Sequence, residues 1–374
     1  MFLDASSGEP LLPEARRAWL AAAESGWGDP LRLHRPGRLA AQALDRAREV
    51  VAVTVGARPD EVVFTSSGVA SSLAAVAGLC RGRRRVGSRV VSSAIEHSAV
   101  LAAAAAWGEP VSVPVDAAGR LDLSSWQAAV EAPGVAAACL QVANHEVGTG
   151  QPYAAAAEIC RAVDVPMILD ASAALGRLDL SAEVPWSVLT AAASSFGGPA
   201  SVGILVIRRG TRWRVPYPAD DYQAGRWPGP PDVPAVVAAA VALETWLDTR
   251  EPVAEFQHAL SASLRAGLAR RVADVDVVGD PDRRVPHLVA CSVLYLEGDT
   301  LTLELDRAGF AVSSGSACSA NTDTPSHVLA AMGALTHGNL RIGLTRTTTR
   351  EDVDAFLDAL ALIVDRLRAT VGAP

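Results

Sequence analysis

The chain contains no lysine. Its 33 basic residues other than histidine are all arginines, although lysine is normally among the commonest residues of a soluble protein. A genome rich in guanine and cytosine favours arginine codons, which explains a scarcity of lysine better than a complete absence. Whatever the cause, this chain cannot supply an ε-amino group. That excludes any reaction that needs an imine between one of its own lysines and a carbonyl compound.

Other common signals are missing as well. The five cysteines are scattered and no Cys-x-x-Cys pair occurs, which argues against a zinc site and against a disulfide framework. The first residues, Met1–Ser6, lack the basic and apolar regions of a signal peptide. An apolar run such as Val233–Leu247 is too short to cross a bilayer. We therefore predict a cytoplasmic protein that binds no metal and no membrane.

The charge balance argues against nucleic acid as a partner. The net charge is −8 at pH 7 and the isoelectric point is about 5.4, whereas a general nucleic-acid-binding protein presents a basic face. The one basic cluster, Arg81–Arg85, lies between a predicted helix and a predicted strand, and we interpret it as a solvated loop. Half of the residues are hydrophobic and a fifth are charged, which predicts a large core.

Short apolar runs of strand length alternate with helical patterns from Leu12 to Ile207. This alternation predicts crossover units and an α/β fold with a mostly parallel, buried sheet. Ligands of such sheets lie beyond the carboxyl ends of the strands. The residues that directly follow the predicted strands are therefore candidates for a site: Ser66–Val69, Ile95–His97, Asn144–Glu146, Asp170–Ala173 and Ala193–Gly198.

The pattern changes after the proline-rich connection Val215–Pro234. We predict two helices there, Ala235–Leu247 and Val253–Arg271, followed by strands and helices that include a strand at Ala311–Ser314. This pattern indicates a second, smaller α+β domain. The predicted division is a large domain of residues 13–250 and a small domain formed by residues 1–12 and 251–374.

One cysteine differs from the others in its surroundings. Cys318 lies in the stretch Val-Ser-Ser-Gly-Ser-Ala-Cys-Ser-Ala of residues 312–320, and small residues form loops that can approach a ligand closely. The other four, Cys80, Cys139, Cys160 and Cys291, lie in apolar patterns, where a thiol is a small inert hydrophobe. Cys318 is thus the candidate for a reactive thiol. The alternative is a serine-rich turn with an incidental cysteine.

Several motifs together resemble a known family. They occur in order as Gly28-Asp29-Pro30, Leu33–Arg38, Glu96–Val100, Glu146-Val147-Gly148, Gln151-Pro152, Asp170-Ala171, Phe196–Pro199, Ser313–Ser319, Pro325–Leu329 and Arg341–Leu344. In this order they resemble the cysteine desulfurases, which belong to the class V aminotransferases of fold-type I pyridoxal phosphate (PLP) enzymes. The resemblance covers nearly the full length. It implies a large domain with a mostly parallel sheet and a smaller α+β C-terminal domain.

The resemblance also implies a chemistry, and one residue departs from it. In that family a lysine holds PLP as an imine, substrate cysteine displaces the lysine, and a loop cysteine takes up the sulfur as a persulfide while alanine leaves. Here Ser195 stands where the lysine belongs, and Ser194 replaces the histidine before it. A serine hydroxyl cannot form an imine. PLP is therefore expected as the family's cofactor, but not as a covalently bound one.

Other cofactor contacts of the family are changed too. The phosphate-binding threonine and serine, the glutamine on the PLP phenolic oxygen, and the Gly-Thr pair that crosses the dimer all lack their functional groups here. The asparagine beside the ring is replaced by His145, next to Asn144. The changed positions are Val69, Ala192, Ala173, Gly229-Pro230 and His145. A valine or an alanine cannot donate a hydrogen bond to a phosphate dianion.

Four residues keep the family's functional types. By resemblance, His97 stacks on the PLP ring, Asp170 pairs with the pyridinium nitrogen, and Cys318 carries the persulfide. Arg341 holds the substrate carboxylate by a bidentate pair. Structural alternatives stay open for three of them. His97 could cap a helix, Asp170 could cap a turn, and Arg341 could pair with a surface acid.

Three functions remain open. In the first, covalent PLP catalysis is lost and the protein accepts or relays sulfur through Cys318, or only binds partners; the expected partner is an active desulfurase or a sulfur-acceptor protein. In the second, it binds PLP or pyridoxamine phosphate without a covalent bond and still catalyses a reaction. In the third, it is an active cysteine desulfurase with another group in place of the lysine. The resemblance implies a homodimer, and we predict the apolar face of Val233–Leu247 and the proline-rich segment Val215–Pro234 before it as its contacts.

Overall fold

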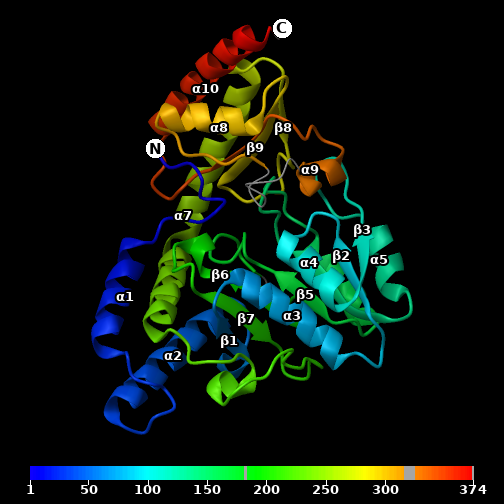
Figure 1. Cartoon of the computed structure of the whole chain (residues 1–374), viewed down its shortest axis with the longest axis vertical. Coiled ribbons are helices and arrows are strands. Elements are labelled where there is room, and N and C mark those ends of the chain that lie inside the picture. The colour runs from blue at the N-terminus through cyan, green and yellow to red at the C-terminus, as the bar shows by residue number, and fades with distance from the viewer. Residues whose placement is uncertain (181–182, 316–324, 373–374) are drawn as a thin grey trace.

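The computed structural model describes residues 1–180, 183–315 and 325–372 (Figure 1). A seven-stranded sheet organises the larger part of the chain. In spatial order its strands are β1 (Val62–Thr65), β7 (Gly203–Ile207), β6 (Val188–Ala192), β5 (Met167–Asp170), β4 (Val135–Gln141), β2 (Arg89–Ser93) and β3 (Glu109–Val113). The strands from β6 to β3 are parallel, and β7 and β1 are antiparallel to their neighbours. This confirms the predicted α/β fold with a mostly parallel sheet.

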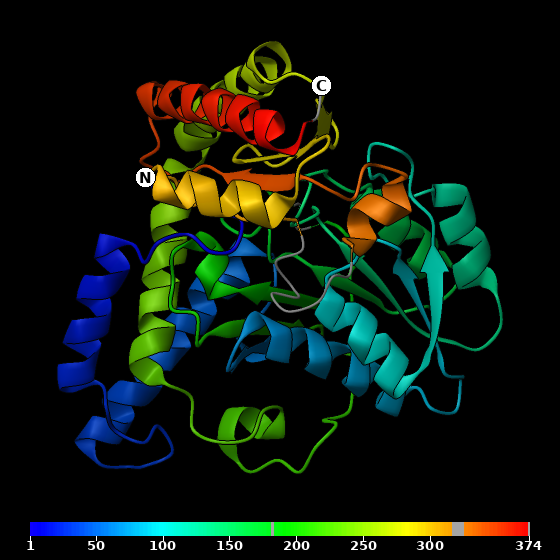
Figure 2. The same cartoon turned by 45° about the horizontal axis from the view of Figure 1, so that its top comes forward.

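Side chains along each strand alternate between two apolar cores, as the two-residue period of a strand requires. Ile168, for example, lies in one core and Leu169 in the other. The helices α3 (Gly68–Gly82) and α4 (Ser98–Trp107) cover the first face, as Figure 2 shows. The second face is covered by α1 (Pro13–Ser25), α2 (Arg35–Thr54), α5 (Leu123–Glu131), α6 (Tyr153–Ala162) and the first part of α7 (Val233–Arg271).

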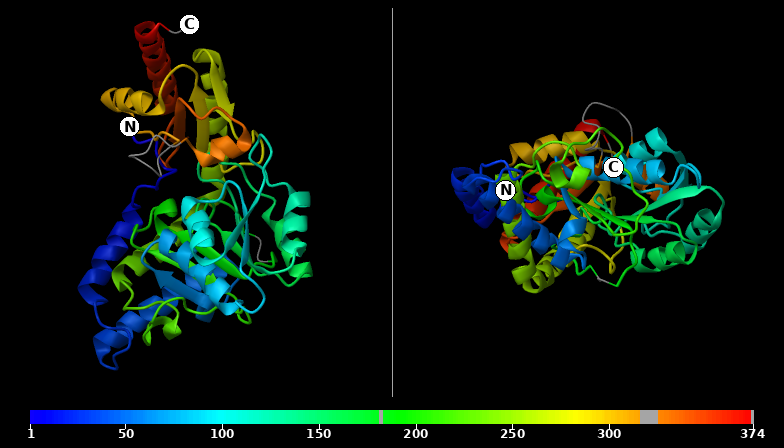
Figure 3. Two further views of the ribbon diagram at one scale, coloured as in Figure 1. Left: turned by 45° about the vertical axis from the view of Figure 1, so that its right-hand side comes forward. Right: turned by 90° about the horizontal axis from the view of Figure 1, so that it is seen from below.

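A second unit has its own sheet and core. The strands β10 (Asn339–Gly343), β9 (Leu288–Val293) and β8 (Val275–Val278) form an antiparallel sheet in this order. It packs with α8 (Gly298–Arg307), α10 (Arg350–Val371) and the second part of α7. The short helix α9 (His327–Met332) lies beside it. Figure 3 shows this unit stacked on the larger one.

The first residues of the chain join this second unit. Leu3 is buried in its core, and single bridges connect Phe2 with Ala311 and Asp4 with Gly343. The expected strand at Ala311–Ser314 is wrong, because only isolated bridges form there, Phe2–Ala311 and Ser313–Arg341. The division of the chain into domains stays a prediction, since α7 runs through both cores without a break.

The two helices predicted around residue 250 are in fact one. Helix α7 continues over 39 residues with Pro252 inside it, although a proline in a helix removes a hydrogen bond and crowds the preceding turn. Packing offsets this cost, because Leu243 and Trp246 are buried in the large core while Leu260 and Leu264 are buried in the small one. Each half of the helix is therefore fixed by its own set of apolar contacts.

The same packing contradicts one part of the predicted dimer contact, the apolar face of Val233–Leu247. The apolar residues of Val233–Leu247 are mostly buried within their own chain, against α1 and α2, so this face cannot receive a second copy. Among the described residues there are also three short 3₁₀ helices, η1 (Pro59–Glu61), η2 (Ala193–Phe196) and η3 (Tyr222–Gly225). No helix in the described part of the chain is both long and apolar enough to span a membrane.

Candidate functional site

A cavity of about 340 Å³ lies at the carboxyl ends of the parallel strands, where a ligand is expected in this type of sheet. Its walls come from the N-terminal segment, the start of α3, the residues after β5 and β6, and the strands β9 and β10. Six of the predicted site residues line it: His97, His145, Asp170, Ser194, Ser195 and Arg341. Asn144 does not, and Cys318 lies outside the described residues.

Two histidines stand together in the cavity wall. His97 caps α4, because its Nδ1 accepts a hydrogen bond from the backbone N–H of Ala99 at 3.1 Å, which leaves the proton on Nε2. The His145 ring lies 5.0 Å from that of His97 at an angle of 58°. Burial, with added repulsion from His97 and Arg341, holds the pKa of His145 well below its usual range. His145 is thus a neutral imidazole at pH 7.

Asn144 has a different role from its neighbour. Its side-chain amide is completely buried, donates to the carbonyl of Ile95 at 3.0 Å, and accepts from the backbone N–H groups of Glu146 and Val147 at 2.8 Å. Both ends of the amide are therefore used to hold the turn after β4. His145, which the turn directs into the cavity, is the residue available to a ligand.

Asp170 is the last residue of β5 and is buried at the bottom of the cavity. One of its oxygens accepts from the backbone N–H of Ser172 at 2.9 Å, so the expected turn cap is present. Behind it lies Glu96, which accepts from the backbone N–H of Gln141 at 3.0 Å. Burial and the charge of Asp170 raise the pKa of Glu96 well above its usual range. Asp170 is thus the carboxyl group of this pair that faces a ligand.

The start of α3 is where the resemblance places the cofactor phosphate, and two serine hydroxyls there bond to their own helix. Ser67 Oγ accepts from the backbone N–H of Ala70 at 3.1 Å, and Ser72 Oγ donates to the carbonyl of Gly68 at 3.2 Å. A Cβ added at Gly68 would lie 2.5 Å from that of Ala192, so the two residues are in tight contact. The backbone N–H groups of this turn and the O–H of Ser67, which accepts but does not donate here, remain for an anion.

These observations test whether PLP fits the residues present. Val69 and Ala192, which take the places of the family's phosphate-binding hydroxyls, offer no donor, and Ala173 replaces a third polar contact. Ser195 lies in the cavity wall with a hydroxyl in place of an amine. His97 and Asp170 would suit a pyridine ring, but a phosphate dianion needs charge-assisted donors. The residues of this chain therefore do not fit the whole cofactor.

A buried ion pair holds the turn that carries Ser194 and Ser195. Arg177 Nη2 and Glu9 Oε2 lie 2.7 Å apart, and both side chains are almost completely buried. Arg177 donates to the carbonyl of Ser195 at 3.0 Å, and the backbone N–H of Glu9 donates to the carbonyl of Ser194 at 2.9 Å. The guanidinium also stacks on Trp246 at 4.5 Å. The backbone of the turn is thus held from both sides.

The opposite side of the cavity carries nitrogen atoms that are buried without a hydrogen-bond partner. Arg341, on β10, donates through Nη2 to Ser7 Oγ at 2.8 Å, while Asp4 is 4.0 Å away. A buried donor without a partner costs about 1–3 kcal/mol, so this side favours a ligand with oxygen acceptors, such as a carboxylate. The unpartnered atoms on residues that line the cavity are His145 Nδ1, Arg177 Nη1, His287 Nδ1 and Arg341 Nε.

Sequence reasoning missed three of these residues. Arg177 follows β5 by seven positions and belongs to no motif. His287 precedes the strand β9, whereas the rule of carboxyl ends points to residues that follow strands. Glu9 lies in the N-terminal segment, far from the cavity in sequence. The one available signal was Arg177 itself, a charged residue between Leu175 and Leu178. Within the described residues, no group of His, Cys, Asp and Glu side chains could hold a metal ion.

Glu146 lies beneath the described end of the cysteine-containing stretch. It is buried, and a Cβ added at Gly315 would lie 3.0 Å from its Oε1, which has no hydrogen-bond partner. Burial raises the pKa of Glu146 to about 7, against the opposing effects of Ser326 and Arg341. This carboxyl group can therefore hold or release a proton near neutral pH.

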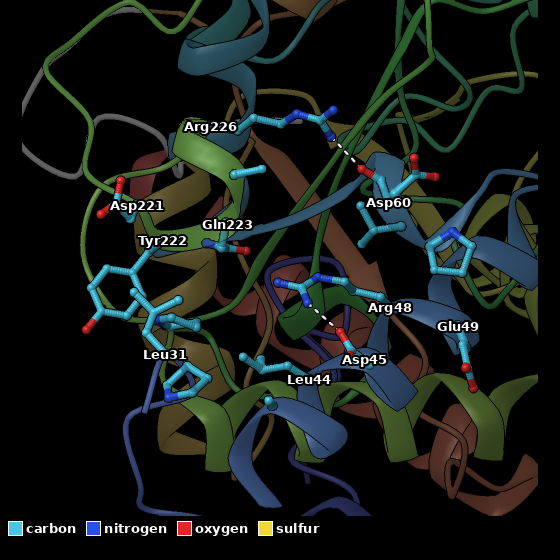
Figure 4. Close-up of a pocket in the computed structure, with 16 residues that line it drawn as sticks. Leu31, Leu44, Asp45, Arg48, Glu49, Asp60, Asp221, Tyr222, Gln223 and Arg226 are labelled. Atoms are coloured by element: carbon cyan, nitrogen blue, oxygen red, sulfur yellow. Dashed lines mark hydrogen bonds and ion pairs between the residues drawn. The ribbon is translucent and has the colours of Figure 1, made fainter. Parts of the chain in front are cut away.

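A larger cavity of about 580 Å³ lies elsewhere and contains none of the predicted residues. Figure 4 shows it between α2 and η3, with Leu31, Leu44 and Tyr222 in its wall. Its charged side chains are engaged at the rim, for example Arg48 with Asp45 at 2.8 Å. No buried polar atom among its lining residues lacks a partner within the described chain. Its size alone is therefore no evidence of a functional site.

Comparison with known proteins gives a consistent picture. A family model described as aminotransferase class-V matches residues 28–356. A cysteine desulfurase of Cereibacter sphaeroides is 34% identical over 99% of this chain and 97% of its own length. The cysteine desulfurase IscS of Dictyoglomus turgidum is 30% identical over 98% and 95%. Among solved structures, a NifS-like protein superposes with a TM-score of 0.91 at 25% identity, covering 98% of this chain and 99% of its own.

The raised pKa of Glu146 yields a testable prediction. Its pKa is about 7 in the folded chain against an ordinary value of 4.5, so the folded state binds the proton more tightly. The stabilising contribution is complete below pH 4.5 and is lost as the pH rises to 7. Relative to the wild type, Glu146→Gln should gain about 3 kcal/mol of unfolding free energy over this interval. Urea unfolding at pH 5 and pH 8 measures the change.

The matched control is Glu131→Gln, which removes an exposed carboxyl group on α5. Its difference from the wild type should stay constant with pH. A constant difference for Glu146→Gln as well would show that this carboxyl group titrates normally in the folded protein.

Proposed function

The chain belongs to the aminotransferase class V family, and on this premise we propose that it is a cysteine-desulfurase-like protein that no longer forms a covalent bond to PLP and handles sulfur through Cys318. The observation that carries the proposal is Ser195, which lines the cavity at the position of the family's lysine in a chain without any lysine. The missing side-chain donors at Val69 and Ala192, which line the same cavity, support it. Relatives named cysteine desulfurases, similar over nearly the whole chain, support the connection with sulfur.

The proposed step needs no cofactor. The thiolate of Cys318 attacks the outer sulfur of a persulfide on a donor, so that a new sulfur–sulfur bond forms. The sulfur–sulfur bond of the donor breaks, and the donor leaves as a thiol after taking up a proton. The result is a persulfide on Cys318, which a second thiol can receive in the same way. We place this exchange in the cytoplasm, with an active desulfurase as donor and a sulfur-acceptor protein as recipient.

A second candidate is an enzyme that binds PLP or pyridoxamine phosphate without a covalent bond. The position of His97 and Asp170 in one cavity favours it. The lack of side-chain donors at the phosphate end speaks against it, since each missing charge-assisted hydrogen bond lowers affinity by about 1.5–3 kcal/mol. An ordinary desulfurase, the third candidate, would need an amine in place of Ser195.

The cofactor prediction can be tested directly. Purified protein incubated with PLP and then dialysed should show no visible absorbance band of an imine and no mass increase after borohydride reduction. The single substitution Ser195→Lys should restore an amine but no measurable alanine production from cysteine, because Val69 and Ala192 still offer the phosphate no donor. A rate near that of an intact desulfurase would show that the cavity still holds the cofactor correctly.

The sulfur prediction concerns Cys318. The other four thiols are buried, which raises the pKa of Cys80 to about 11, those of Cys160 and Cys291 to about 12, and that of Cys139 well above its usual range. At pH 7 they are unreactive. When the protein is mixed with an active desulfurase and cysteine, mass spectrometry should find the persulfide on Cys318.

The control variants are Cys318→Ser, which should lose all label, and Cys80→Ser, which removes the most exposed of the four buried thiols and should keep it. Label on a buried cysteine, or none on Cys318, would refute the sulfur role and leave only partner binding.

We also propose a homodimer, with a contact surface different from the one first predicted. Four large apolar residues are exposed within thirteen positions: Trp27 at 70%, Leu31 at 48%, Leu33 at 88% and Leu39 at 42%. Single exposed apolar residues are ordinary, but such a cluster is typical of an interface.

The double variant Trp27→Ser with Leu33→Ser should be monomeric in light scattering at micromolar concentration. Leu362→Ser, exposed at 72% on α10, should not change the mass, and a monomeric wild type would disprove the dimer.

A further inference from the structure

A second polar cavity, of about 490 Å³, lies at the opposite edge of the large sheet. The strands β5 and β6 have one end in each cavity. Asp170 and Ala192 line the first, whereas Pro166 and Ser187 line the second. Helix α3 likewise begins at the first cavity, with Gly68, and ends beside Arg83 at the second. Its 15 residues correspond to about 22 Å of helix. The two cavities are therefore separate sites.

The wall of this second polar cavity is unusually rich in arginine for a chain of net charge −8. One carboxylate, Asp164, faces the cavity among several guanidinium groups from three different segments of the chain. These segments are the residue after α3, the end of α6 and the residues after β7. The arginines are Arg83, Arg161, Arg208, Arg209 and Arg212.

Arg83 is the most buried arginine of this cluster. We predicted Arg81–Arg85 as a solvated loop, but Arg83 is only 8% exposed. It donates through Nη2 to the backbone carbonyl of Asp164 at 3.0 Å, and its Nη1 lies 3.8 Å from that residue's carboxylate. Its Nε is buried and has no partner. A buried guanidinium with an unused donor on a cavity wall is a ready partner for an oxyanion.

The other four arginines differ in how firmly their side chains are held. Arg208 is held by stacking on Trp186 at 3.9 Å and pairs with Glu61 at 3.6 Å. Arg161 and Arg209 pair with Glu158 at 2.5 Å and Asp60 at 4.0 Å, with their side chains 65% and 72% exposed. Such exposed pairs contribute little, so both side chains can turn toward a stronger anion. Arg212 is exposed, and no ion pair is found for it in the described chain.

We propose that this cavity binds an oligophosphate, a ligand with two or more linked phosphate groups. Guanidinium groups bind phosphate oxygens in pairs, which makes arginine the preferred residue for such recognition. Two fixed arginines and three movable ones match an anion that carries several charges over several ångströms. The cavity volume lies within the range of about 300–1,000 Å³ for small-molecule sites. Arg208 covers Trp186, so recognition rests on the phosphate chain and not on stacking of a base.

Isothermal titration calorimetry with inorganic tripolyphosphate at constant ionic strength tests the proposal. The wild type should bind one equivalent. The double variant Arg209→Ala with Arg212→Ala should bind at least 10-fold more weakly, while keeping its circular dichroism spectrum, because both side chains are exposed. The matched control, Arg16→Ala with Arg17→Ala, removes two exposed arginines from α1 and should bind like the wild type.

Equal weakening in both double variants would show unspecific attraction and overturn the proposal. So would the absence of tripolyphosphate binding when a short polyglutamate peptide does bind, because the surface would then serve an acidic partner. Adenosine triphosphate separates the two sources of the ligand. Equal or weaker binding than tripolyphosphate is expected, since Arg208 covers Trp186, and tighter binding would overturn recognition by the phosphate chain alone.

Discussion

The buried ion pair between Glu9 and Arg177 is the interaction on which the first cavity depends. It joins the N-terminal segment to the residues after β5, and both partners also hold the backbone of the Ser194–Ser195 turn. Glu9 Oε1 accepts in addition from the backbone N–H of Arg346, which belongs to the second unit. Removing one partner of such a pair leaves an unpaired buried charge, which costs about 3–5 kcal/mol. This ion pair therefore connects the larger unit of the structure with the second unit.

The N-terminal segment continues this connection toward Arg341. Ser7 accepts from that guanidinium, and Asp4 receives the hydroxyl groups of Ser6 and Ser7. A Cβ at Gly343 would lie 2.4 Å from the backbone nitrogen of Ser6, so only glycine allows this segment to lie so close to β10. These contacts hold the N-terminal segment in the cavity wall beside Arg341.

The sequence allowed the α/β fold and most of the cavity wall to be predicted, because both follow from local rules. Strand periodicity indicates the sheet, and the rule of carboxyl ends locates His97, Asp170 and Ser195. What could not be predicted depends on distant contacts. Helix α7 continues through Pro252 because two separate cores hold its halves. Glu9 and Arg177 meet across 168 positions. Arg83 donates to the backbone carbonyl of Asp164, which is 81 positions away.

The distribution of satisfied and unsatisfied polar groups distinguishes this cavity from a cofactor site with one residue changed. If only the lysine had been replaced, donors for the phosphate would remain at the start of α3. Instead Val69 and Ala192 offer no side-chain donor there, and Ser72 donates to its own helix, which leaves the O–H of Ser67. Buried guanidinium nitrogens without a partner lie on Arg341 and Arg177. The wall of the cavity thus offers unpaired guanidinium nitrogens on Arg341 and Arg177, but few side-chain donors at the start of α3. Such a wall suits a small carboxylate better than a phosphate dianion, since a guanidinium can match a single negative charge while the few donors at α3 carry no charge to balance two.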